Sequence, residues 1–250
     1  MLKMLLVVVT LILLTVFPHL GSTAKLEGLI LAFPFDEGKG ETVKDVSGKD
    51  FVGKGSKTKW TDGKFGKALE FNGKDAHVEV PGGVIADLPN NQISFGAWFF
   101  LIGHNGYDRM VTMTGILAQV GEKCCRYRIM ATSGMNPFYD MGEHADIGVG
   151  TFTFKVKKWY HYVATYDSKE VKIFVDGELI HTQAKKVKLP EFETPLLVGT
   201  GEAPGVHPTH GLVDEMFVYD RAISQQEIKD SIDGFEVILR IKPRGKLSVS

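Results

Sequence analysis

The stretch that decides the fold is Trp159-Tyr-His-Tyr-Val-Ala-Thr-Tyr166, which is followed by Asp167-Ser-Lys169, Glu170-Val-Lys-Ile-Phe-Val175, Asp176-Gly177 and Glu178-Leu-Ile-His-Thr182. Aromatic and β-branched residues dominate the longer segments, and these residue types are enriched in β-strands. Asp-Gly between two such segments is a strong signal for a tight hairpin turn. The stretch therefore predicts consecutive antiparallel strands joined by short turns.

The same composition recurs along the chain in short segments that turn residues separate. Further strands are predicted at residues 29–35, 65–71, 76–80, 93–102, 195–199 and 212–219. The segments 65–71 and 76–80 flank Asn72-Gly-Lys-Asp75 and are predicted to form a hairpin. In contrast, the Gly- and Lys-rich segment 47–56 is predicted to be a solvated loop.

One segment near the C-terminus has the signals of a helix. Ser224 and Glu227 fit the S-x-x-E capping box, in which each side chain bonds the backbone N–H of the other residue. We therefore predict a short helix at residues 224–232. Many regularly spaced strands before one helix are typical of an all-β fold, an antiparallel two-sheet jelly-roll sandwich with one short C-terminal helix.

Alternation along the predicted strands identifies the residues that should form the hydrophobic core. They are Phe33, Phe35, Leu69, Phe71, Phe95, Trp98, Tyr162, Phe174 and Val218. Trp159 also lies in an apolar strand and is expected in the core, whereas the sequence does not decide the place of Trp60.

The N-terminus predicts export from the cell. Lys3 precedes an apolar run at residues 4–17, and Ser22-Thr-Ala24 supplies the small residues of a cleavage site. The apolar run is shorter than the ~20 residues that span a bilayer. We expect secretion to an extracellular or periplasmic space, with no membrane insertion after cleavage. The expected parts are a signal peptide at 1–24, one β-sandwich domain at 25–235, and a C-terminal strand or tail at 236–250.

The charge balance argues against a nucleic-acid partner, and the two cysteines argue against a disulfide between distant segments. The chain has 29 Lys and Arg against 30 Asp and Glu, and a nucleic-acid partner requires a basic surface. We therefore expect no nucleic-acid partner. Cys124 and Cys125 are adjacent, so they cannot join distant segments. In an oxidising compartment they form a vicinal disulfide, stay as thiols or link to another chain.

Four stretches, taken in order, resemble the laminin-G-like, concanavalin A-like jelly-roll family. They are Phe35-Asp-Glu-Gly-Lys-Gly40; Gly63-Lys-Phe-Gly-Lys-Ala-Leu-Glu-Phe-Asn-Gly73 with Val78-Glu-Val-Pro81; Trp159-Tyr-His-Tyr-Val163 with Val171-Lys-Ile-Phe-Val-Asp-Gly177; and Gly211-Leu-Val-Asp-Glu215 with Tyr219-Asp-Arg-Ala-Ile-Ser224. The resemblance covers nearly all of residues 28–232. It implies two packed antiparallel sheets that bind a glycan or an extracellular protein at a concave face or loop rim. Similar folds carry a structural calcium ion near the chain ends.

Between residues 103 and 146 the chain departs from this family pattern, so ligand residues are expected there. Aromatic side chains in these loops can stack against the apolar side of a sugar ring, while polar neighbours bond its hydroxyls. The candidates are Asn105, Tyr107, Asp108, Arg109, Asn136, Phe138, Tyr139 and Asp140. Equally, the aromatic residues could anchor the loops to the sandwich.

Asp36, Asp75 and Asp214 are the candidate calcium ligands, because each lies at or near a strand end and calcium prefers six to eight hard oxygen ligands. The resemblance places the first and last strands together, which brings Asp36 near Asp214. Alternatively, Asp36 and Asp75 are ordinary turn residues. Backbone N–H groups or a basic side chain could also satisfy Asp214, which interrupts an apolar strand.

No catalytic motif is visible in the sequence. Glycosidases need two carboxylates that face each other about 5–10 Å apart, and the chain has no E-x-D-x-E run. Asp214 and Glu215 are neighbours and should point to opposite faces of a strand. We expect a binding module and not an enzyme. The alternatives are a glycoside hydrolase or lyase with acids on separate strands, and a structural or adhesive envelope protein.

Overall fold

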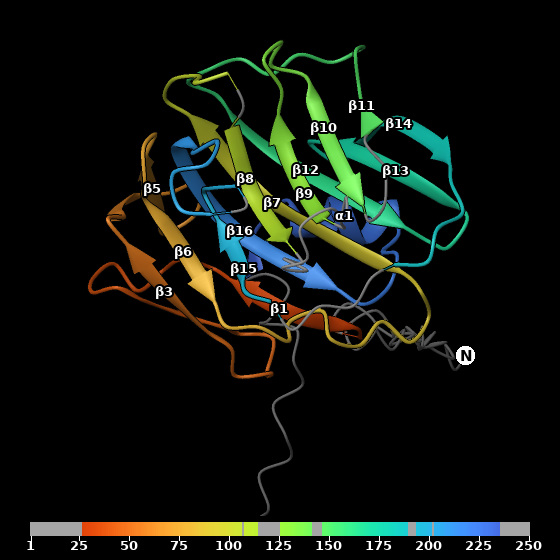
Figure 1. Cartoon of the computed structure of the whole chain (residues 1–250), viewed down its shortest axis with the longest axis horizontal. Helices are drawn as coiled ribbons and strands as arrows, with labels where there is room; N and C mark the ends of the chain where they lie inside the picture. Colours follow the sequence, from red (N-terminus) through yellow and green to blue (C-terminus); the bar gives the residue numbers. More distant parts are fainter. Residues whose placement is uncertain are drawn as a thin grey trace, which may run out of the picture.

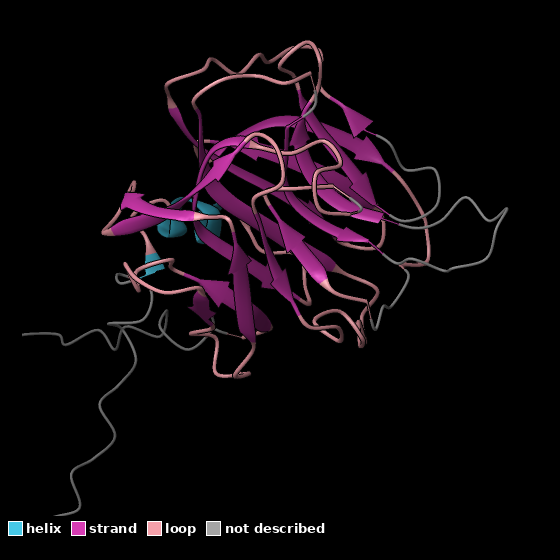
Figure 2. Ribbon diagram, turned by 60° about the vertical axis from the view of Figure 1, so that its left-hand side comes forward, coloured by secondary structure: helices cyan, strands magenta, loops and turns pink. Residues whose placement is uncertain are grey.

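The computed structural model describes residues 27–106, 108–114, 126–141, 147–189, 194–201 and 203–235, with the backbone alone at 109–114, 126, 140 and 141. Two antiparallel sheets lie face to face, as the two ribbon views show (Figures 1 and 2). The predicted fold class, an antiparallel sandwich with one short helix, is confirmed. Within the described ranges, no helix is long and apolar enough to cross a membrane.

The two sheets are named A and B here. Sheet A contains, in spatial order, β14 (Glu178–Ala184), β13 (Glu170–Val175), β12 (Trp159–Tyr166), β7 (Ile93–Leu101), β16 (His210–Tyr219), β5 (Lys67–Asn72) and β4 (Lys59–Asp62), and β1 (Leu29–Phe33) also pairs with β16. Sheet B contains β11 (Ile147–Gly148), β10 (Pro137–Met141), β9 (Arg126–Ala131), β8 (Asp108–Thr114), β15 (Leu196–Val198), β6 (His77–Val80), β3 (Val52–Ser56) and β2 (Thr42–Lys44). Three of these strands, β8 to β10, lie in the region where loops were expected.

The consecutive strands predicted from the opening stretch are confirmed as β12, β13 and β14. Asp176 and Gly177, which join β13 to β14, have φ angles of 51° and 78°. A two-residue hairpin of this type needs positive φ at both positions, and Asp-Gly meets that need at low cost. The local signal of Asp-Gly was therefore sufficient to predict this turn.

The hairpin predicted at residues 65–80 is wrong. β5 pairs with β4 and β16 in sheet A, whereas β6 pairs with β3 and β15 in sheet B. Between them, Oδ1 of Asn72 accepts the backbone N–H groups of residues 74–76 at 2.9–3.1 Å. This turn carries the chain from one sheet to the other, so both strands face the same core from opposite sides.

The segment 47–56 is not entirely a loop, because its second half is β3. Gly53 faces the core, and a Cβ built there would lie 2.9 Å from Val78 and 3.3 Å from Phe33. Glycine therefore lets the two sheets approach closely at this point. The abundance of Gly, which suggested a loop, instead serves close packing.

The main core lies between the sheets and contains seven of the nine predicted core residues. They are Phe33, Phe35, Leu69, Phe71, Phe95, Tyr162 and Val218, each 0–1% exposed. Trp98 and Phe174 are also buried, but on the outer face of sheet A. Side chains alternate along a strand, and Phe95 and Phe99 face the main core, so Trp98 points the other way.

A second apolar layer covers part of that outer face. Residues of β1, β12, β13 and β16 pack there against Ile223, Ile228 of α1 (Gln225–Ser231) and Phe235. The predicted helix and its capping box at Ser224 and Glu227 are confirmed. α1 lies behind the sheets in Figure 1.

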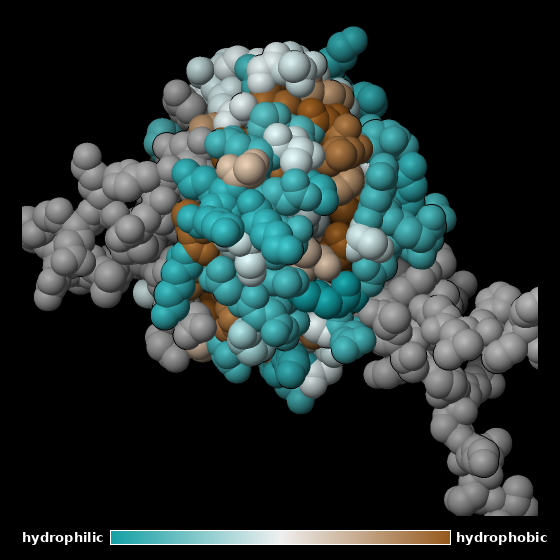
Figure 3. All heavy atoms as spheres, turned by 90° about the vertical axis from the view of Figure 1, so that its right-hand side faces the viewer, coloured by the Kyte–Doolittle hydropathy of each residue, from teal (hydrophilic) through white to brown (hydrophobic). Residues whose placement is uncertain are grey.

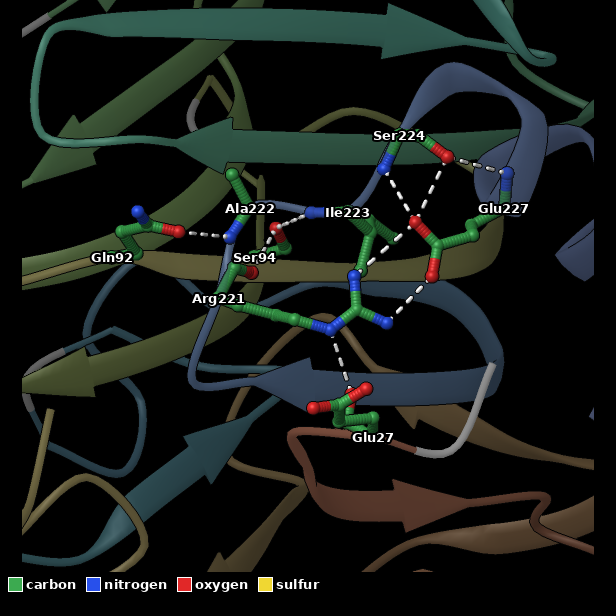
Figure 4. A network of polar contacts seen from close by, with 8 residues as sticks. All are labelled: Glu27, Gln92, Ser94, Arg221, Ala222, Ile223, Ser224 and Glu227. Atoms are coloured by element: carbon green, nitrogen blue, oxygen red, sulfur yellow. Dashed lines mark hydrogen bonds and ion pairs between the residues drawn. The ribbon is translucent and has the colours of Figure 1, made fainter. Parts of the chain in front are cut away.

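A polar network fixes α1 to sheet A (Figure 4). Arg221 donates to both carboxylate oxygens of Glu227, at 3.2 and 2.5 Å, and to the backbone carbonyl of Glu27 at 2.7 Å. Ser94 on β7 bonds the backbone of Arg221 and Ile223. Burial works against ionisation of Glu227, but hydrogen bonds from Arg221 and Ser224 outweigh it and lower the pKa of Glu227.

The edge strand β14 exposes most of its side chains, including Leu179, which is 45% exposed. β14 lies on the right in Figure 1, and Figure 3 shows the molecule from that side. Hydrophilic side chains cover most of that side, and apolar side chains form a narrow band among them. Mainly polar side chains around a sheet edge disfavour pairing with another chain.

Candidate functional site

The loops predicted to bind a ligand meet at one end of the sandwich, where their polar groups bond one another. Nδ1 of His104 donates to the Asp108 carboxylate at 2.5 Å, and Nε2 lies 3.3 Å from the backbone carbonyl of Ser133. Asn105 donates to the carbonyl of Gly73 at 3.2 Å. These contacts tie the 102–106 loop to the neighbouring turns.

Most of the predicted ligand residues that can be examined are therefore structural. The Asp108 carboxylate is fully buried and also accepts the backbone N–H of His210. Burial raises the pKa of Asp108, although its hydrogen bonds oppose that rise. Asn136 donates to the carbonyl of Phe152 at 2.7 Å, which holds two loops together. Only Asn105 is largely exposed.

The prediction that Tyr139 stacks on a sugar is wrong. Its ring is 0% exposed and lies in the main core, 5.2 Å from the ring of Phe95. Alternation along β10 turns it inward, so it anchors the strand. Tyr107, Cys124 and Cys125 lie outside the described residues, as do residues 1–24, 236–250 and the side chains of Arg109 and Asp140.

Two of the predicted calcium ligands hold the same loop. Oδ2 of Asp214 accepts the backbone N–H groups of Lys64 and Phe65 at 2.9 and 3.0 Å. Oδ1 of Asp36 accepts the N–H of Lys67 at 2.8 Å. Burial raises the pKa of Asp214 to about 7, and the nearby charge of Asp36 adds to the rise. We call residues 63–67 the clamped loop.

This arrangement does not fit a calcium ion held by the three aspartates. Backbone N–H donors occupy the Asp214 oxygens that a cation would need. Asp75 is bound instead by Lys57 at 2.5 Å, which lowers the pKa of that carboxyl. In the part of the chain that the structure describes, no group of three or more His, Cys, Asp or Glu side chains could hold a metal ion.

Asp214 and Glu215 do not point to opposite faces as predicted. A β-bulge shifts the register between Asp214 and Phe217, and Glu215 has a φ of 49°. Asp214 lies opposite Trp98, on the outer face of sheet A, and Glu215 accepts the N–H of Phe235 in the layer above that face. Both acids therefore hold the covering segments in place.

Of the hollows lined by residues that the structure describes, the larger lies at the β2–β3–β6 end of sheet B. It has a volume of about 480 Å³, within the usual range of ligand pockets. We call it the sheet B groove. Its lining residues are Glu41, Val52, Lys54, Gly55, Ser56, His77, Glu79 and Pro81.

Side chains on one face of β3 and β6 form the polar wall of the groove. Lys54 lies opposite Glu79, and Ser56 lies opposite His77. Nδ1 of His77 donates to the carbonyl of Asp75 at 2.9 Å. Among the described residues, the charged groups of Lys54, Glu79 and Glu41 have no ion-pair or hydrogen-bond partner.

The sheet B groove also has an apolar wall. Val52 is 51% exposed, the highest value among the described large hydrophobic side chains, and Pro81 is exposed. Sequence reasoning missed this groove because residues 47–56 were interpreted as a loop. The signal that could have found it is the alternation of Val52, Lys54 and Ser56 with two inward glycines.

Comparisons with solved structures show the same fold at low sequence identity. Domain 4 of AbnA, a GH43 extracellular arabinanase from Geobacillus stearothermophilus, in complex with arabinotriose, matches with a TM-score of 0.61 and 18% identity, over 81% of this chain and 97% of that one. Trypanosoma rangeli sialidase in complex with sialic acid gives 0.65 and 16%, over 84% of this chain but 33% of the sialidase.

A third similar structure is the binding domain of Paraclostridial Mosquitocidal Protein 1, with a TM-score of 0.63 and 14% identity, over 84% of this chain and 53% of that one. No curated protein matches the sequence. The profile of the concanavalin A-like lectin/glucanases superfamily matches residues 72–229, more than half of the chain. Together with the two antiparallel sheets, this match shows that the chain belongs to the concanavalin A-like lectin/glucanases superfamily.

Proposed function

We propose that this protein is a secreted, non-enzymatic module that binds a short neutral saccharide in the sheet B groove. The observation that carries the proposal is a groove of about 480 Å³ lined by charged groups without partners in the described residues. Such groups are available to a ligand as far as the described residues are concerned, because none of these residues pairs with them.

The lining of the groove matches the chemistry of a sugar. Lys54 donates hydrogen bonds, Glu79 and Glu41 accept them, and the hydroxyl of Ser56 does both. A sugar hydroxyl also donates and accepts, so it can satisfy each of these groups. Val52 and Pro81 can contact the apolar C–H side of the ring. The lining carries both signs of charge, so a strongly charged ligand would meet a like charge.

The similar solved structures support a carbohydrate and suggest a probe. One is described in complex with arabinotriose and another with sialic acid. At 18% and 16% identity these likenesses establish the fold alone, and the ligand is an inference for this chain. Arabinotriose is the natural first probe, because its complex is with a domain that this chain covers almost completely.

The test is isothermal titration calorimetry of the secreted protein with arabinotriose and other neutral trisaccharides. Lys54→Met should weaken binding about tenfold or more, because a hydrogen bond from a charged group is lost. Lys44→Met is the matched control, since Lys44 is exposed on β2 but does not line the groove. Equal affinity of both variants and the wild type would refute the groove as the site.

A glycoside hydrolase is the second candidate, because Glu41 and Glu79 both line the groove. The general acid of a glycosidase usually lies in an apolar pocket, whereas both of these acids are exposed and Lys54 lies opposite Glu79. We therefore favour binding without catalysis. Release of reducing ends from arabinan, abolished by Glu79→Gln, would establish the enzyme instead.

A further inference from the structure

The outer face of sheet A is covered over only part of its length. The clamped loop covers Trp98, with Phe65 edge-on at 6.2 Å between ring centroids and Nζ of Lys64 4.4 Å from the ring centre. One step further along β7, Phe100 points to the same side but is only half-buried. The open part of the face begins at this residue.

The cross-strand register places five side chains in one row on this open part. Trp159 lies opposite Phe100, and Phe100 lies opposite Leu212. The row continues through Glu70 to Lys59 on β4. Strands lie about 4.8 Å apart, so the row is roughly 19 Å long. We call Trp159, Phe100 and Leu212 the aromatic strip. All three side chains are half-buried. The prediction that Trp159 lies in the core is therefore wrong.

We infer that the aromatic strip is a second glycan-binding surface, which takes a linear chain of neutral sugar residues laid across the strands of sheet A. Aromatic faces stack against the C–H side of sugar rings. The rings of Trp159 and Phe100 are 5.6 Å apart and inclined by 51°, and Leu212 extends the apolar surface to a third strand, so the strip is about 10 Å long and longer than one sugar ring. A chain fits this geometry better than a single sugar.

Polar groups beside the strip complete the site. Glu70 and Lys59 continue the row on β5 and β4. These side chains can donate to or accept from sugar hydroxyls. The row contains one acid and one base, which favours a neutral chain over a charged one.

The exposed area argues for a glycan and against a folded protein as the occupant. Aromatic side chains bury 150–250 Å² each when covered completely. Three half-buried side chains of this size or smaller therefore still expose no more than about 375 Å². A stable protein interface needs about 800 Å² from each partner, which the strip does not approach.

The strip and the sheet B groove lie on the outer faces of different sheets, with the main core between them. One domain can therefore hold two sugar ligands at once. The strip does not depend on the groove, and each can be tested in the absence of the other.

The test uses the three tryptophan indole N–H signals in NMR spectra of the ¹⁵N-labelled mature chain. Cellohexaose, xylohexaose and arabinohexaose are each added up to about 10 mM, a range that detects weak binding. At least one should shift the Trp159 signal. Trp60, whose Nε1–H donates to the carbonyl of Gly40 at 2.8 Å, and Trp98, which is 4% exposed, are internal controls.

Phe100→Leu keeps the strip apolar but removes one ring, so it should weaken the Trp159 response about fivefold. Trp159→Phe should retain binding, followed through backbone signals. Lys54→Met in the groove should leave the Trp159 response unchanged. The unchanged remainder of each spectrum shows whether a variant is folded.

Three results would overturn the inference. The first is a Trp159 signal that none of the three hexasaccharides moves. The second is a Trp159 response that Lys54→Met abolishes, which would mean one site instead of two. The third is a Trp159 signal that shifts on dilution or on removal of residues 236–250, with no sugar response, because a second copy or the C-terminal segment would then occupy the strip.

Discussion

His161 and Asp214 lie on the same face of sheet A, and burial shifts the pKa of each in the opposite direction. His161 is 1% exposed, its ring centre is 5.2 Å from that of Trp98, and burial lowers its pKa to about 3. The unfolded chain takes up this proton near pH 6.5, so His161 removes stability as the pH falls from 6.5 towards 3.

Asp214 acts with the opposite sign. Burial raises the pKa of Asp214 from 3.8 to about 7 in the folded chain. The folded state therefore holds a proton that the unfolded state lacks, and Asp214 adds stability as the pH falls from 7 towards 3.8. Each group changes the free energy of unfolding by about 1.4 kcal/mol per pH unit, so the two offset each other between about pH 4 and 6.5.

His161→Phe should isolate the contribution of His161. The wild type loses stability at acidic pH because His161 takes up a proton in the unfolded state only. The variant has no such group, so its stability relative to the wild type should rise as the pH is lowered from 6.5 to about 4. Urea unfolding of both proteins at several pH values gives this difference directly, and the other titrating groups cancel in it. A difference that does not vary with pH would mean that His161 is not buried in its neutral form.

At the scale of elements, Asp214 and Asp36 hold the clamped loop between β4 and β5 in place. Asp214 receives its donors from residues 149 and 150 positions away in the chain. Gly63 and Gly66 permit the close approach, because a Cβ at either would lie within 2.6 Å of an Asp oxygen. The loop, in turn, covers Trp98 and so sets the boundary of the aromatic strip.

This assignment makes a prediction about calcium. Since N–H groups already satisfy Asp214, thermal melts in millimolar calcium and in EDTA should superimpose. A native-state ligand at a hundredfold excess over its Kd would add about 2.7 kcal/mol and several degrees to the melting temperature. If calcium does raise it, Asp214→Asn tells whether the ion binds at the clamped loop, because the rise should then disappear.

At the scale of the whole molecule, many residues of the four stretches that carry the family resemblance are structural. Asp36, Gly63 to Gly66 and Asp214 form the clamped loop, and the stretch from Tyr219 to Ser224 anchors α1 through Arg221. The same stretches also contain Glu79 and Pro81 of the sheet B groove, and Trp159 and Leu212 of the aromatic strip. The resemblance therefore predicts the fold but does not identify the ligand, because function lies in sites added to a fold.

Export is also a property of the whole chain. The apolar run and Ser22-Thr-Ala24 predict cleavage after Ala24, so the mature protein should begin at Lys25. N-terminal sequencing of secreted protein checks this. Recovery of material that begins at Met1 would contradict the prediction and would call for a membrane anchor to be considered.

The sequence alone determined the elements whose cause is local. The strands of the opening stretch, the turn at Asp176 and Gly177, and the capping box of Ser224 with Glu227 depend on residues a few positions apart, and all appear as predicted. Local patterns also identified most of the main core, because alternation sorts the two faces of a strand.

Only the tertiary structure decided which sheet each strand joins and which parts of an outer face are covered. β5 and β6 look like a hairpin but enter different sheets, and Trp98 is covered while Trp159 is open. Both outcomes depend on contacts between residues far apart in the chain, such as Lys64 with Asp214. A pattern of hydrophobic and polar residues records that a face is buried, but not which segment buries it.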